Sequence, residues 1–189
     1  MDAIISGLEF NCPGEAVENK KIHDIIVERY EQNLNKIYNQ GNRQENSDIW
    51  GFFRDEVHRC IEKDTNYCNI LVIFTDGYLR YDGRKDSKLV NTTSIQPQYL
   101  FPYRRPDWSN LIDRDKVSIA PCQENLQNLE ILVLEIKGEN SFVDEENILI
   151  YLWEEWLKKM GVKENNYLVL KSALPSMRKI DIEYFLNQK

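Results

Sequence analysis

The residues best placed for chemistry follow a short apolar run near the middle of the chain. Asp76 and Gly77 come directly after residues 69–75, which read NILVIFT. Ligands of open α/β sheets bind beyond the carboxyl ends of the strands, and a carboxylate there is a ligand that Mg²⁺ accepts. A glycine at this position lets the backbone turn sharply beside a ligand. The pattern indicates a metal or ligand site, and the alternative is that Asp76 caps the following turn through its own side chain.

A second set of charged residues is formed by Asp107, which follows Pro106, and by Glu135 and Lys137. Their order matches the pattern of the PD-(D/E)xK nucleases, in which two acids hold Mg²⁺ and a lysine polarises the attacking water or stabilises developing charge. Glu135 and Lys137 lie two residues apart, so a strand would place them on one side. The other interpretation is a solvated pair of charges at the end of a strand.

A third set lies in an irregular stretch at about residues 78–122, which holds four of the six prolines. Tyr, Trp and Arg side chains dominate the energetics of protein interfaces, and loops carry many binding residues. The sequence therefore predicts a binding surface in this stretch, and the alternative is a loop packed by its own aromatic side chains. The residues of this predicted surface are Tyr103, Arg104, Arg105 and Trp108.

These residues need a scaffold, which the apolar patterns indicate. Three short runs rich in branched aliphatic residues, 69–75, 129–136 and 167–171, predict strands of a parallel sheet, and the first is expected to be buried on both faces. Helices are predicted at about 22–41, 48–63, 144–160 and from 175 onward. Alternating helices and strands predict an α/β fold, a three-layer α/β/α sandwich with a Rossmann-like, mostly parallel sheet.

Length and composition limit the kind of protein. The chain has 189 residues, 42% of them hydrophobic, and a net charge of −7. These values predict one domain over residues 1–189, with the irregular stretch as an insertion, and argue against a nucleic-acid partner. No apolar run is long enough for a transmembrane segment, and no signal peptide is visible at the first residues. A soluble, cytoplasmic protein is the default expectation, unless the chain is a fragment of an exported one.

Residues 69–78 resemble the strand and Thr-Asp-Gly turn of the von Willebrand factor A-type (vWA) domains. Ser47, with Asp48 and Ile49, is similar to that family's middle threonine element, and the resemblance extends from Ser47 to the end of the chain. It implies a three-layer α/β/α fold and a metal-ion-dependent adhesion site that uses Ser47 and Asp76. The family's DxSxS motif is absent, so we expect a degenerate site that is vestigial or binds Mg²⁺ weakly, and otherwise no cofactor.

Together these patterns favour a non-catalytic protein-interaction or scaffolding module whose partner is an unidentified protein. The alternative is a Mg²⁺-dependent nuclease or phosphodiester hydrolase that uses Asp107, Glu135 and Lys137. The two hypotheses use different residues, so the positions of these residues in the tertiary structure bear on both.

Overall fold

A computed structural model describes residue 32 and residues 48–64, 66, 68–81, 89–123, 125–139, 142 and 144–187. The chain divides into two compact units, Met1–Glu45 and Asn46–Lys189, and of the first only Gln32 is described, in a helix. Apart from Gln32, the helix predicted over residues 22–41 lies outside the described residues, and so does Ser47. The single domain expected over the whole chain stays a prediction, and the description below concerns the second unit.

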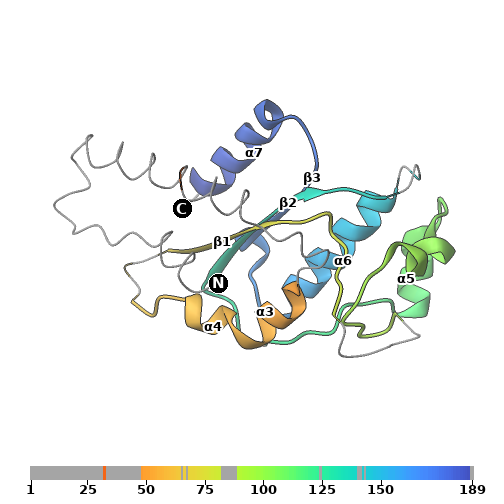
Figure 1. The fold of residues 1–189 in the computed structure, drawn as a ribbon, viewed down its shortest axis with the longest axis horizontal. Coiled ribbons are helices and arrows are strands. Elements are labelled where there is room, and N and C mark those ends of the chain that lie inside the picture. The colour runs from red at the N-terminus through yellow and green to blue at the C-terminus, as the bar shows by residue number, and fades with distance from the viewer. Residues whose placement is uncertain are drawn as a thin grey trace. The chain divides into compact units, whose positions relative to one another are not determined.

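A three-stranded parallel sheet is the centre of this unit (Figure 1). The strands are β1 (Asn69–Phe74), β2 (Leu129–Ile136) and β3 (Tyr167–Lys171), and they lie in the order β1-β2-β3. Asn69 pairs with Leu129 and Phe74 with Leu134, so β1 and β2 are in continuous register. All three predicted strands and the α/β class are thereby confirmed.

Two long helices follow the strands where the sequence predicts them. Helix α6 (Glu145–Lys159) connects β2 to β3 and carries acidic residues in its first turn and lysines in its last, the distribution that the helix dipole favours. The chain leaves α6 through Gly161 at φ +83°, a left-handed conformation that glycine adopts without strain. Helix α7 (Pro175–Asn187) begins at a proline, which suits a first helical position.

The helix predicted before β1 is divided into α3 (Ile49–Asp55) and α4 (Val57–Cys60). The side chain of Asp48 accepts a hydrogen bond from the Gly51 amide at 2.7 Å, which caps α3. The irregular stretch contains the 3₁₀ helix η3 (Pro97–Tyr103) and α5 (Trp108–Asp115), and a second 3₁₀ helix, η4 (Glu164–Asn166), precedes β3.

The main core lies on the side of the sheet that carries α6. Trp153 and Trp156 are fully buried there, and their indole N–H groups donate to the carbonyls of Gly77 and Ala120 at 2.8 and 2.9 Å. The two tryptophans therefore pack in the core. The irregular stretch adds fully buried side chains to the same core, so it is an integral part of the unit; they include Leu79, Ile95, Leu100, Ile112 and Ile119.

The opposite side of the sheet is covered only in part. Phe185 of α7 packs against Leu132 and Leu134 of β2. The neighbouring side chains of β1 on this side are exposed, with Val72 at 44% and Phe74 at 66%. The prediction that β1 is buried on both faces is therefore wrong, and the three-layer arrangement stays a prediction. A continuous apolar run does not reveal which of its sides receives a neighbour.

Within the described ranges, no helix combines the length and apolarity that a bilayer crossing needs.

Candidate functional site

Asp76 lies where the sequence places it, at the carboxyl end of β1. Its Oδ1 atom accepts a hydrogen bond from the Tyr78 amide at 3.0 Å, and the hydroxyl of Thr75 accepts one from the Gly77 amide at 3.1 Å. Both bonds close the turn that follows the strand. The Asp76 carbonyl in turn accepts from the Lys137 amide at 3.0 Å, which ties the ends of β1 and β2 together. The capping alternative for Asp76 is thus present in the structure.

The same Asp76 side chain is exposed and keeps one oxygen outside this turn. Its predicted partner in a metal site, Ser47, lies outside the described residues. In the part of the chain that the structure describes, no group of three or more His, Cys, Asp or Glu residues is arranged to hold a metal ion. The weak metal site at Asp76 therefore stays a prediction.

A buried charged cluster lies behind this turn, and the sequence analysis did not anticipate it. Glu145, in the first turn of α6, is fully buried. Its Oε1 atom accepts hydrogen bonds from the Tyr78 hydroxyl and from Nη2 of Arg104, both at 2.7 Å. We call these three residues the Glu145 cluster. It joins the end of β1, the irregular stretch and α6.

The surroundings of the Glu145 cluster are closely packed. Arg104 also donates to the carbonyl of Pro97 at 3.1 Å, and its guanidinium lies 4.2 Å from the centre of the Phe101 ring. The Tyr78 hydroxyl accepts from the Glu139 amide at 3.0 Å. Burial, and secondarily the carboxylate of Glu145, raises the pKa of Tyr78, so the hydroxyl stays protonated and donates. The cluster is well suited to hold three segments in place.

The four residues of the predicted binding surface differ in how far this packing leaves them exposed. Tyr103 is buried, and Arg104 exposes only 11% of its side chain because it pairs with Glu145. Trp108 is half-buried, edge-on to the ring of Tyr151 at 5.8 Å. Arg105 is exposed and pairs with Asp107 at 3.2 Å. The structure thus leaves Arg105 and part of Trp108 available to a partner, and the binding prediction itself is untested.

The alternative catalytic set is distributed over separate contacts. Glu135 lies at a bulge between β2 and β3 with φ +71°, and its carboxylate accepts a hydrogen bond from the Ser172 hydroxyl at 2.6 Å. Lys137 is exposed just beyond β2, and Asp107 occupies the N-cap position of α5. Among the described residues, no hydrogen bond or ion pair joins Asp107 to Glu135 or Lys137. The hydrolase alternative stays a prediction.

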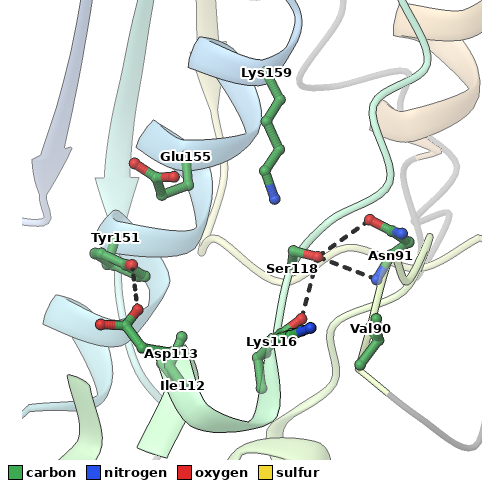
Figure 2. A pocket seen from close by; sticks show the side chains of 10 residues that line it. Val90, Asn91, Ile112, Asp113, Lys116, Ser118, Tyr151, Glu155 and Lys159 are labelled. Carbon is green, nitrogen blue, oxygen red and sulfur yellow. Dashed lines mark hydrogen bonds between the residues drawn. The ribbon is translucent and has the colours of Figure 1, made fainter. Parts of the chain in front are cut away.

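A pocket of about 370 Å³ lies beside α6 (Figure 2). Its walls come from the end of α5, the second half of α6 and residues 90–91, and no sequence pattern pointed to it. Ile112 and Val117 supply an apolar floor, and two lysines and two acidic residues stand around it. The charged residues of this wall are Asp113, Lys116, Glu155 and Lys159.

No family model, curated protein or solved structure matches this chain.

Proposed function

We propose that the chain is a non-catalytic protein-interaction module whose main contact surface is the open side of β1. This surface, the β1 face, consists of Ile70, Val72 and Phe74. Their exposed fractions are 46%, 44% and 66%, whereas Leu132 and Leu134, which pair with Val72 and Phe74, are buried under α7. This contrast between adjacent strands is the observation that carries the proposal.

The β1 face is costly to leave in water. Burial of a large aliphatic or aromatic side chain contributes about 1.5–3 kcal/mol, so each half-exposed member leaves roughly 1 kcal/mol unused. Monomeric proteins rarely expose large contiguous apolar patches, and such patches mark interaction sites. A partner that covered the β1 face would recover this energy.

Helix α7 adds a second apolar surface on the same side of the sheet. Met177, Ile180 and Tyr184 recur at spacings of three and four residues and expose between 62% and 70% of their surface. We call them the α7 ridge. Because Phe185 and Ile182 face the sheet, the α7 ridge points elsewhere on the helix and is open to a partner. The β1 face and the α7 ridge together favour a partner with apolar side chains.

The finer parts of the hypothesis belong to the same proposal. A vWA-type fold with three layers and a weak metal site at Asp76 agrees with the parallel strand order and with the position of Asp76 beyond β1. In such a module the β1 face and the exposed Arg105 would act as contact surfaces, and Asp76 would stabilise its own turn.

The test compares three forms of the full chain as immobilised bait in native cell extract: wild type, Phe74→Ser and Phe101→Ser. Phe101 is the matched control because it is also a phenylalanine and exposes 60% of its surface in η3; its loss removes the contact of its ring with Arg104, which stays paired with Glu145. We expect a protein that wild type and Phe101→Ser retain and Phe74→Ser loses. Light scattering on the same three forms detects a second copy as the partner.

The proposal is contradicted if the three forms retain the same proteins and have the same molar mass in solution. Circular dichroism of each form must match before the comparison counts, because a serine at an exposed site should leave the fold intact.

A further inference from the structure

The pocket beside α6 has a rigid frame. Two backbone hydrogen bonds, from Thr92 to the Ser118 carbonyl (2.9 Å) and from Ala120 to the Thr92 carbonyl (2.8 Å), join the segment after Asn91 to the segment that follows α5. The Ser118 hydroxyl further donates to Asn91 Oδ1 at 3.2 Å. The pocket's shape is therefore set by the fold rather than by loose side chains.

Two wall residues have left-handed backbone conformations. Asn91 has φ +51° and Lys116, which ends α5, has φ +55°. Such conformations cost a non-glycine residue roughly 1–2 kcal/mol, although asparagine tolerates them better than most. Both line the pocket and lie beside Ser118, whose hydroxyl bonds Asn91 Oδ1 and the Lys116 carbonyl, so the fold fixes where their side chains begin.

The charges of the pocket are separated into two groups (Figure 2). Glu155 lies on the same side as Tyr151 and Asp113, whose hydroxyl and carboxylate are hydrogen-bonded at 2.9 Å. Lys159 extends toward Ser118 on the other side. Burial, and then Asp113, raises the pKa of Tyr151 to about 12, so at neutral pH its hydroxyl keeps the proton that it donates.

Among the ion pairs of the described residues, none joins Glu155 to Lys159, although their spacing on α6 favours one. A glutamate four residues before a lysine is the preferred spacing for pairing along a helix. Glu155 instead lies 3.7 Å from the Lys158 ammonium, a long and exposed contact. In the described part of the chain, neither Lys116 nor Lys159 forms an ion pair. A carboxylate side and an ammonium side thus remain available to a ligand.

We propose that this pocket binds a small zwitterion, an α-amino acid with an apolar side chain. Its carboxylate would accept hydrogen bonds from Lys159 and Lys116, and its ammonium would donate to Glu155 and Asp113. Its side chain would rest on the apolar floor of Ile112 and Val117.

The volume and the charges both restrict the ligand class. About 370 Å³ lies at the small end of ligand pockets, which span roughly 300–1,000 Å³. A simple anion would meet the two carboxylates and a simple cation the two ammonium groups, and like charges in one site are unfavourable. A zwitterion satisfies both sides with charge-assisted hydrogen bonds.

The test uses three ligands with one hydrocarbon body and different charges: L-leucine, 4-methylpentanoate, which lacks the ammonium, and 3-methylbutylamine, which lacks the carboxylate. Calorimetry on the full chain should give saturable binding of L-leucine, at least about tenfold tighter than either analogue. L-valine and L-phenylalanine are titrated in parallel to cover other apolar side chains. Nitrogen-15 NMR shifts should be largest at the Asn91 and Ser118 amides.

Two variants locate the binding. Lys159→Gln should weaken binding of the amino acid at least about tenfold. Lys163→Gln is the matched control, because it removes the same charge from an exposed lysine that neither lines the pocket nor pairs with one of its carboxylates, and it should leave the affinity within about twofold. Both lysines are exposed, so both variants are expected to fold normally.

Three results would each overturn the inference. The first is the absence of saturable binding by all three amino acids up to roughly 10 mM. The second is equal binding of L-leucine and one of its singly charged analogues. The third is equal loss of affinity in Lys159→Gln and Lys163→Gln, which would indicate a general effect of charge. None of these results depends on a protein partner at the β1 face.

Discussion

Replacement of Arg104 by methionine tests the Glu145 cluster most directly. Methionine keeps much of the aliphatic stem of Arg104 and removes its guanidinium, so the Glu145 carboxylate keeps its hydrogen bond from the Tyr78 hydroxyl at 2.7 Å and loses the one from Arg104. Glu145 is fully buried, and its Oε2 atom already has no hydrogen-bond partner. The variant therefore leaves the buried Glu145 carboxylate without its cationic partner, so we expect a large loss of stability.

The size of this loss follows from the geometry. Two unit charges about 4 Å apart attract by about 4 kcal/mol at the effective dielectric constant of about 20 that describes protein sites. Loss of one partner of a buried ion pair costs about 3–5 kcal/mol in other proteins. We expect Arg104→Met to lower the free energy of unfolding by about 3–4 kcal/mol, and the melting temperature by roughly 6–16 °C.

Urea unfolding followed by circular dichroism measures the loss, and three further variants interpret it: Arg105→Met, Glu145→Gln alone, and Arg104→Met combined with Glu145→Gln. Arg105→Met removes the neighbouring arginine, whose ion pair with Asp107 is exposed, and it should cost less than about 0.5 kcal/mol. Arg104→Met combined with Glu145→Gln also removes the unpaired carboxylate of Glu145. This double variant should be more stable than the sum of the single losses predicts, by about 2 kcal/mol.

Two results would contradict this role of the Glu145 cluster: Arg104→Met costs no more stability than Arg105→Met, or the losses of Arg104→Met and Glu145→Gln simply add in the double variant. Either result would mean that Glu145 loses little when its arginine is removed, and that the cluster does not hold the irregular stretch against α6.

Four further predictions concern the carboxyl edge of the sheet. Gly77→Ala should lower the free energy of unfolding by about 1–2 kcal/mol in urea titrations, because residue 77 has φ +99° and a Cβ would lie 3.0 Å from Ile136 Cδ1. Calorimetry with Mg²⁺ and Mn²⁺ should detect no sub-millimolar affinity, and an affinity that Asp76→Ala abolishes would contradict this. Because burial raises the pKa of Tyr78, the unfolded chain releases this proton first, and the free energy of unfolding should fall as the pH rises above about 10. Tyr78→Phe should reduce that slope by at most about 1.4 kcal/mol per pH unit, as read from unfolding curves at several alkaline pH values. Plasmid DNA incubated with Mn²⁺ and the protein should stay intact, whereas cleavage that Glu135→Ala removes would favour the hydrolase alternative.

Local patterns determined the regular elements of this protein. The strands over residues 129–136 and 167–171 and helix α6 match their predicted bounds to within one residue. Their signals are short-range: apolar periodicity, acidic residues at the start of a helix, lysines at its end and a glycine after it. The capping role of Asp76 is equally local, because its bond reaches only two residues along the chain.

The features that depend on distant residues were decided by the tertiary structure alone. Arg104 and Glu145 are 41 positions apart, and an arginine in a loop rich in aromatics predicts an exposed contact equally well. The one-sided burial of β1 depends on where α7 lies, and the β2–β3 bulge at Glu135 depends on β3. The pocket beside α6 is made by three segments that no pattern connects.

The physical reason is the range of the interactions. Helix periodicity, caps and strand propensity act over a few residues, so one sequence carries them completely. Burial, ion pairing and pocket shape are set by whichever segments the fold brings together, and side chains of the same type serve a core, a buried ion pair or a free surface accordingly. For this chain, the sequence alone therefore determined the strands and helices, and the packing decided which of its charged and aromatic residues remain open to a ligand or partner.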